Sequence, residues 1–368
     1  MLAENLQKFI VSLLYGSLVL QSFIVLVNPM NVNKKANLYF GLFLFFWSGY
    51  WILDVLLLCD LQAGEAFKNV IYLLQIFTPI LLYFSVIFFI NPNYTYKRYN
   101  LFCLVIPIIY ALFLFNSKEN KLYYTVAMFI DVSHNLLYLV ILYFKIKHHQ
   151  SRIQIISSNT DHVNLQWLVK FIILMLITLS ITVGYELYNI FIYKKHEHLW
   201  MDMLFLGMVY MTSYYSLRQK EIYPIDEHQR KELLAFELED PAELDKKKLI
   251  SDEEFEIARQ RLLLVMDTEK PYLDGELNLI RLAQLMQMSS HQLSYLINKG
   301  FNENFFSFIN NYRVQRAKEL LLSERNHKLN LLGIAYESGF NSKTSFNTIF
   351  KKSTHQTPSE FRKKSSDL

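Results

Sequence analysis

The chain has 368 residues, of which 52% are hydrophobic and 19% are charged, and its formal net charge is +4. This length suits two or three domains, and the distribution of charge excludes one soluble domain, because residues 1–217 hold 14 Lys and Arg whereas residues 218–368 hold 23. None of the ten glycines forms a GxGxxG or GxxxxGK[ST] loop, no HExxH motif or nucleophile elbow occurs, and Cys59 and Cys103 form no CxxC pair. We therefore expect no catalytic centre, no metal site and no cofactor.

Seven apolar stretches follow one another in the first part of the chain. Each approaches the ~20 mostly apolar residues that a helix needs to cross a bilayer. They cover residues 9–27, 38–58, 70–90, 101–115, 122–144, 167–193 and 199–217. Buried helices of a large soluble protein are the alternative, but seven such stretches in a row favour the membrane. The sequence thus predicts a seven-helix transmembrane bundle, residues 1–217, in the lipid bilayer.

Lys and Arg residues near the ends of these stretches predict the orientation of the bundle, because cytoplasmic loops carry an excess of both. If the N-terminus lies outside, the cytoplasmic loops and the start of the tail hold eleven of them and the outer loops hold six. We therefore expect a multi-pass protein of the inner cell membrane with its C-terminal part in the cytoplasm.

Polar side chains in the fifth stretch form a stripe. Asp131, His134, Asn135 and Tyr138 have i, i+3, i+4 and i+7 spacing, which places them on one face of a helix. Ionisable residues are costly inside a bilayer and by default suggest function. Two interpretations are equally favoured: the stripe makes hydrogen bonds between helices, or it is part of a pocket for an unknown signal or ligand.

Acidic residues dominate the connection between the two parts of the chain. Nine Asp and Glu occur from Glu221 to Asp245, where Arg230 and Lys231 are the bases. The sequence predicts a linker at residues 218–250. A solvated spacer is the favoured interpretation, and a segment that lies against a basic domain is the alternative.

A first helix-turn-helix unit is predicted after the linker. Ser251 and Glu254 have the spacing of a capping box, which begins a helix. Two shorter helices follow at 279–287 and 290–299, with a turn at 288–289. In this layout the second helix enters the major groove of DNA. Gln287 occupies a turn position where glycine is usual.

A second unit of the same kind follows at residues 331–338 and 343–352, with Gly339 in its turn. One long helix, 305–323, connects the two units. At ~1.5 Å per residue this helix is about 28 Å long, which is close to the ~34 Å of one DNA turn. The sequence therefore predicts an all-α domain, residues 251–364, whose two reading helices enter successive major grooves of double-stranded DNA.

The charge of this region agrees with a DNA partner. Residues 281–364 hold 13 Lys and Arg but only five Asp and Glu. A local positive excess is the electrostatic footprint of a protein that neutralises phosphates.

These motifs resemble the DNA-binding domain of the AraC/XylS family of bacterial transcription regulators. The resemblance rests on KPYL at 270–273, FFSFINNYRVQRAKELLL at 305–322, IAYESGFNSKTSFNTIF at 334–350 and TPSEFR at 357–362. It implies two sets of base-contacting residues, one on each reading helix: His291, Ser294 and Tyr295 on the first, and Lys343, Thr344, Asn347 and Thr348 on the second. It further implies phosphate contacts by Arg313, Lys351 and Lys352. Gln287 and Tyr295 depart from the family pattern.

The leading hypothesis is a membrane-tethered, sequence-specific DNA-binding transcriptional regulator whose bundle senses a signal. The alternative is an intramembrane receptor or enzyme whose cytoplasmic tail binds a protein partner. The sequence leaves a homodimer open, because two reading helices on one chain need no second copy.

Overall fold

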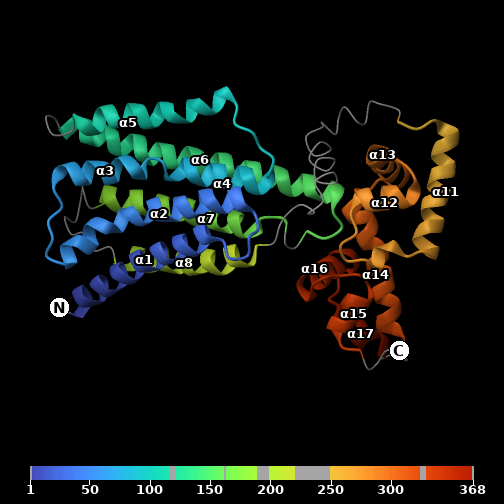
Figure 1. The fold of residues 1–368 in the computed structure, drawn as a ribbon. Helices are drawn as coiled ribbons and strands as arrows, with labels where there is room; N and C mark the ends of the chain where they lie inside the picture. Colours follow the sequence, from blue (N-terminus) through green and yellow to red (C-terminus); the bar gives the residue numbers. More distant parts are fainter. Residues whose placement is uncertain are drawn as a thin grey trace. The chain divides into compact units, whose positions relative to one another are not determined.

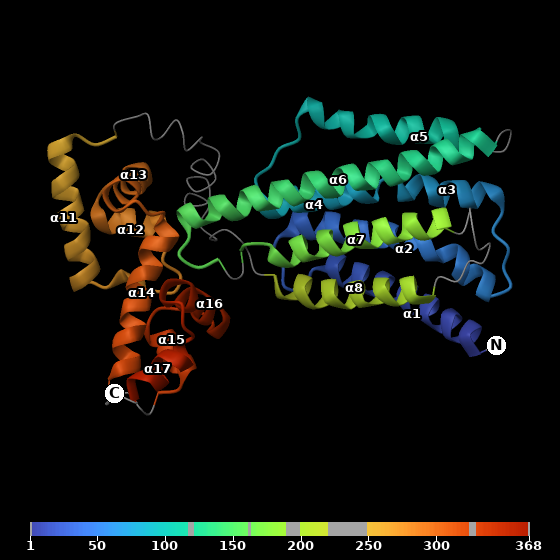
Figure 2. The same cartoon turned by 180° about the vertical axis from the view of Figure 1, so that it is seen from behind.

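The computed structural model describes residues 2–116, 121–160, 163–188, 199–219, 249–323 and 329–366. It divides into two compact units, which are drawn in Figures 1 and 2. Unit 1 comprises Met1–His148 and Leu165–Ile222, and unit 2 comprises His149–Asn164 and Tyr223–Leu368. The described residues form helices and no named strand, which confirms the predicted all-α fold. Most of the predicted linker lies outside the described residues.

Unit 1 is built from helices that run roughly alongside one another (Figure 1). Their bounds are α1 Leu2–Val27, α2 Lys34–Leu58, α3 Glu65–Gln75, α4 Thr78–Ile90, the 3₁₀ helix η1 Arg98–Leu104, α5 Val105–Phe115, α6 Lys121–Ile156, α7 Gln166–Tyr188 and α8 Leu199–Arg218.

Six helical segments among the described residues are long and apolar enough to cross a membrane. They are Glu4–Val27, Lys34–Leu58, Glu65–Ile90, Arg98–Phe115, Leu122–Ile156 and Gln166–Tyr185. The seventh predicted stretch forms α8, which is not one of these six. The third was expected to be continuous, but it breaks between α3 and α4, where Pro79 stands in the first turn of α4. Proline lacks the N–H that a continuing helix requires, so a break before it is expected.

Close packing joins α1, α2 and α8 within unit 1. Ser22 Oγ on α1 donates to Gly41 O on α2 at 2.8 Å. A Cβ at Gly41 would lie 2.6 Å from Leu26 Cγ, so the two helices approach where only a hydrogen fits. Small residues and side-chain hydrogen bonds of this kind are typical of helix contacts in membranes. On α8, Asp202 Oδ1 accepts from Trp51 Nε1 of α2 at 2.9 Å.

Unit 2 contains the predicted DNA-binding region. Its helices are α11 Asp252–Thr268, the 3₁₀ helix η3 Pro271–Leu273, α12 Leu279–Met286, α13 Ser290–Phe301, α14 Phe305–Leu322, α15 Leu331–Glu337, α16 Lys343–Thr354 and α17 Pro358–Ser366. In both views α14 runs between α12 and α13 at one end and α15–α17 at the other (Figures 1 and 2). Two helix-turn-helix units thus share one long central helix.

Local sequence signals explain where these helices begin and end. The predicted capping box is present: Ser251 Oγ accepts from Glu254 N at 3.4 Å, and the Glu254 side chain reaches back to the Ser251 N–H. The two turns contain left-handed residues, Gln287 with φ 54° and Gly339 with φ 86°. An added Cβ at Gly339 would overlap Tyr272 O, so glycine is required there by both backbone angle and space.

Candidate nucleic-acid interface

Helix α16 has an apolar face, which packs into the core of the second helix-turn-helix unit, and a polar face on its opposite side. Phe346 and Phe350 are fully buried among side chains of α14 and α15. On the other side Lys343, Thr344 and Thr348 are exposed, and Lys351 and Lys352 are exposed one turn further on. This polar face leaves α16 free to enter the major groove of DNA, which is wide enough for an α-helix.

A surface concavity of about 400 Å³ is lined by most of the residues of the second helix-turn-helix unit that were predicted to contact DNA. It is lined by Leu331, Lys343, Asn347, Thr348, Lys351, Thr357 and Ser359. Two ammonium groups therefore share this hollow with an amide and three hydroxyls. Together these groups can donate hydrogen bonds to phosphate oxygens or to base edges.

The first turn of α17 borders the same concavity. Thr357 caps this helix, because Glu360 N donates to Thr357 Oγ1 at 3.3 Å and Thr357 N donates to Glu360 Oε2 at 2.8 Å. The bond from the Thr357 N–H lowers the pKa of the exposed Glu360 carboxyl. The helix start is thus held in place by its own cap beside Lys351, which lines the same concavity.

The first reading helix, α13, differs from the expectation. Ser294 is buried, and the Tyr295 ring packs edge-on against Phe255 of α11, with 6.0 Å between ring centroids. Arg259 of α11 lies over the Phe301 ring at 5.6 Å. Helix α11 therefore packs along the side of α13 that carries Tyr295. Of the three predicted base-contacting residues, His291 and Tyr295 are half-buried and Ser294 is only 7% exposed.

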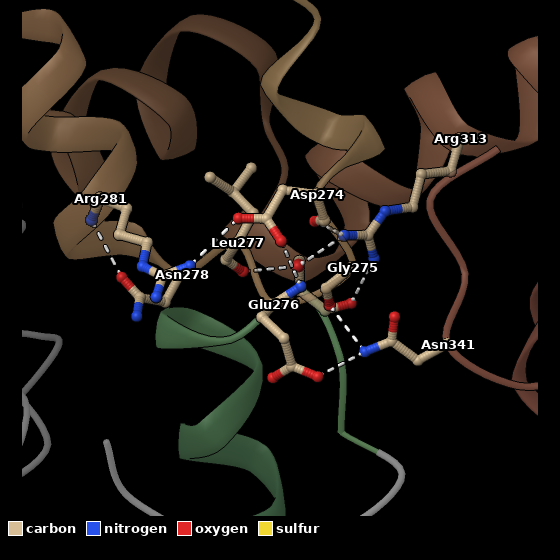
Figure 3. A network of polar contacts seen from close by, with 9 residues as sticks. Asp274, Gly275, Glu276, Leu277, Asn278, Arg281, Arg313 and Asn341 are labelled. Carbon is tan, nitrogen blue, oxygen red and sulfur yellow. Dashed lines mark hydrogen bonds and ion pairs between the residues drawn. The ribbon is translucent and has the colours of Figure 1, made fainter. Parts of the chain in front are cut away.

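Arg313, which was predicted to contact phosphate, is buried inside the DNA-binding region. Its side chain is 1% exposed. Nη2 donates to Asp274 O at 2.9 Å (Figure 3). Nε donates to Tyr272 O at 2.8 Å, and further bonds go to Ser158. The predicted phosphate contact of Arg313 is therefore corrected, because the guanidinium is enclosed and its donors are used within the protein. Burial lowers the pKa of Arg313 to about 10, so the group stays charged at neutral pH.

A second set of contacts around Arg313 joins the two helix-turn-helix units. Asn341 Nδ2, in the turn of the second unit, donates to Gly275 O at 3.1 Å and to Glu276 Oε1 at 2.6 Å (Figure 3). Asp274 pairs with Arg281 of α12 at 3.1 Å. The sequence predicted the turn of the second helix-turn-helix unit but not the contacts of Asn341. One signal for a loop there was visible in the sequence, because the run between Tyr272 and Asn278 is too polar for a strand and too short for a helix.

The residues of the polar stripe on α6 do not all line the same space in unit 1. Asp131, Asn135 and Tyr138 line a cavity of about 670 Å³ among the helices, together with Asp54 and Asp202 among others. His134 is buried but is not among the lining residues. Within the bundle, Asn135 Nδ2 donates to Asp131 O at 3.0 Å and to Asp131 Oδ1 at 3.2 Å. Across the described ranges, no group of three or more His, Cys, Asp and Glu is placed to hold a metal ion.

Comparisons with known proteins agree with the geometry of unit 2. Residues 282–364 match the model of a helix-turn-helix domain family. Over 99 residues the chain is 30% identical to an uncharacterized HTH-type transcriptional regulator of Staphylococcus aureus (strain COL), which covers 27% of this chain and 13% of the relative. Over 85 residues it is 34% identical to the uncharacterized HTH-type transcriptional regulator YijO of Escherichia coli (strain K12), which covers 22% of this chain and 28% of the relative.

The similarity thus spans only a minor part of either relative. No solved structure is significantly similar to the chain. Two helix-turn-helix units on a shared helix, together with the family match, identify the C-terminal region: the chain carries an AraC-type helix-turn-helix domain and is related, over that domain, to HTH-type transcriptional regulators.

Proposed function

We propose that the protein is a membrane-tethered transcriptional regulator that binds a specific sequence in double-stranded DNA through α16. The observation that carries the proposal is the concavity at α16, where Lys343, Asn347, Thr348 and Lys351 converge. A helix-turn-helix domain that offers lysines and an amide on one exposed face has the chemistry for both phosphate and base contacts.

Within this proposal the polar residues divide into two roles. Asn347 has an amide that can pair with the N6 and N7 edge of adenine, and Lys343, Thr344 and Thr348 lie within one turn of it. Lys351 and Lys352 lie near the end of α16, where ammonium groups suit phosphate rather than bases. The first helix, α13, contributes through His291 and, to a smaller extent, through Ser294 and Tyr295, because α11 covers part of it.

The proposal assigns the N-terminal helices to the inner membrane and the DNA-binding domain to the cytoplasm. Six apolar helical segments support the membrane assignment. The cavity that Asp131 and Asn135 line supports a sensing role, since a hollow of about 670 Å³ is within the ~300–1,000 Å³ range of small-molecule sites. His134 then acts within the packing of the bundle rather than on a ligand.

The test is selection of duplexes from a random-sequence pool by the full-length protein in lipid nanodiscs. A common sequence should be enriched. Failure to enrich any sequence would contradict the proposal and favour a tail that binds a protein partner.

Two variants then separate reading from positioning. Asn347→Ala should weaken binding to the enriched sequence by ~1–3 kcal/mol with little effect on unrelated DNA. Lys352→Ala should weaken both alike and lower the slope of log affinity against log salt by about one. Identical behaviour of the two variants would contradict this division of roles.

A further inference from the structure

The last part of α6 and the loop that follows it belong to the DNA-binding unit rather than to the bundle. His149–Asn164 is part of unit 2. An antiparallel bridge joins Ser157 to Asn278, and Ser158 Oγ donates to Leu277 O at 2.6 Å although the two residues are 119 positions apart. Ser158 is 1% exposed. A piece of chain that comprises the end of α6 and the loop before α7 is therefore part of the unit that carries both helix-turn-helix motifs.

Ser158 supplies acceptors to two side chains of the central helix α14. Arg313 Nη1 donates to Ser158 O at 3.0 Å, and Arg313 Nη2 donates to Ser158 Oγ at 2.9 Å. Asn310 Nδ2 donates to Ser158 O at 3.0 Å. A buried guanidinium needs an acceptor for each donor, because unsatisfied donors of a charged group are costly. Ser158 meets this need for both terminal nitrogens of Arg313.

Arg313 stands where the two helix-turn-helix units meet. The loop before α12 provides Tyr272 O and Asp274 O. From the second unit, the position of a Cβ on Gly339 is 3.1 Å from Arg313 Nε, and the Phe340 ring lies 6.0 Å from the guanidinium carbon. In Figure 3 the green ribbon of the loop after α6 passes beside this network. The guanidinium of Arg313 thus contacts residues of both helix-turn-helix units and of the loop after α6.

We infer that residues 157–159 form a docking segment that holds the two helix-turn-helix units in the arrangement that binds DNA. This inference rests on the proposed function. If the segment withdraws, Arg313 and Asn310 lose hydrogen-bond acceptors, and the Arg313 side chain turns toward other acceptors. The loop at Tyr272 and the turn at Gly339 then lose Arg313, the residue that contacts both. Ser158 is then a positioning residue: it holds Arg313, and Arg313 holds the two helix-turn-helix units in place.

The docking segment is also joined directly to the bundle. Helix α6 ends at Ile156, one residue before Ser157, and the same helix carries Asp131 and Asn135, which line the cavity. The docking segment thus follows directly, along the chain, the helix that carries these two cavity-lining residues.

The experiment compares three full-length variants in nanodiscs of phosphatidylethanolamine and phosphatidylglycerol. Ser158→Ala removes the hydroxyl that bonds Leu277 O and Arg313, and Ser158→Leu prevents the segment from seating. Ser157→Ala is the matched control, because it keeps the backbone bridge to Asn278 and removes a hydroxyl that bonds the Asn159 backbone of the same loop instead of Arg313 or Leu277. Affinity is measured for the duplex enriched by the wild-type protein and for a scrambled duplex. Hydrogen exchange is measured without DNA on peptides that cover residues 270–278 and 339–341.

Ser158→Leu should lower affinity for the enriched duplex by about tenfold or more, the change expected when hydrogen bonds to a buried charge are lost. Ser158→Ala should lower it less, and Ser157→Ala should leave it unchanged. Exchange should rise in both peptides for the Ser158 variants alone. If Ser158→Leu binds the enriched duplex like the wild type, or if exchange is unchanged, the inference is overturned while the proposed function stands. If the wild type enriches no duplex but exchange rises as expected, the docking stands and the proposed function fails.

Discussion

Arg313 and Asn347 are both polar residues on helices of the DNA-binding domain, but they differ in what their side chains contact. Asn347 lines an open concavity, whereas Arg313 is enclosed by backbone carbonyls and by Ser158. The resemblance to the AraC/XylS family implied a DNA contact for both. The difference arises from tertiary burial, which decides whether a cation is available to a phosphate.

Arg313→Lys tests the corrected role of this residue. Lysine keeps the charge but is a point donor that cannot reproduce the planar fork of the guanidinium. We expect the free energy of unfolding of unit 2 to fall by at least about 2 kcal/mol, because several bonds of a buried charged group are lost. The measurement is thermal unfolding of the full-length protein without DNA. A variant with wild-type stability and weaker DNA binding would restore the phosphate role.

The two turn residues should respond to substitution with opposite signs. Gln287→Gly relieves a left-handed side chain and should stabilise unit 2 by about 0.5–1 kcal/mol. Gly339→Ala adds a Cβ that overlaps Tyr272 O, and it should destabilise the unit by ~1–3 kcal/mol or more. Urea unfolding of both variants checks the pair. A loss of stability in Gln287→Gly would show that its side chain makes contacts which outweigh the strain.

At the scale of helices, the ends in unit 2 could be predicted closely because caps are local. Helix 305–323 was expected and α14 is Phe305–Leu322; helix 331–338 was expected and α15 is Leu331–Glu337. The break between α3 and α4 was not predicted, although Pro79 was a visible signal, because hydropathy alone reads 70–90 as continuous. The position of Ser158 had no signal at all, since its partners Leu277 and Arg313 are more than a hundred residues away.

The contact between α1 and α2 gives a prediction for the bundle. Gly41→Leu should force the helices apart, because the added side chain meets Leu26 Cγ and the Leu26 backbone nitrogen at 3.2 Å. Overpacking of this kind costs ~1–3 kcal/mol. The melting temperature in nanodiscs should fall accordingly. Gly16→Leu is the control on α1, since a Cβ there meets nothing within 4 Å, and an equal loss in both variants would contradict the explanation.

At the scale of the whole molecule, the orientation in the membrane decides whether the domain can reach DNA. The loop bias of eleven to six Lys and Arg motivates the test. A reporter that is active only in the cytoplasm should work when fused after Leu217 and should fail when inserted in the 116–121 loop. Reversed activities would place the DNA-binding domain outside the cell and end the proposed function.

The discontinuity of unit 2 has a consequence for biosynthesis. Residues 149–164 leave the ribosome well before Arg313, with α7, α8 and the acidic connection made in between. Under the proposed function, the docking segment is therefore synthesised early and remains without its partners Leu277, Asn310 and Arg313 while the remaining helices enter the bilayer. The DNA-binding unit becomes complete only after the N-terminal helices that we propose to span the membrane have been synthesised. If α6 and α7 are not inserted correctly in a nascent or truncated product, the docking segment between them is not placed where the DNA-binding domain can bind it. The order of synthesis therefore links correct membrane assembly to the formation of a DNA-binding domain that can function.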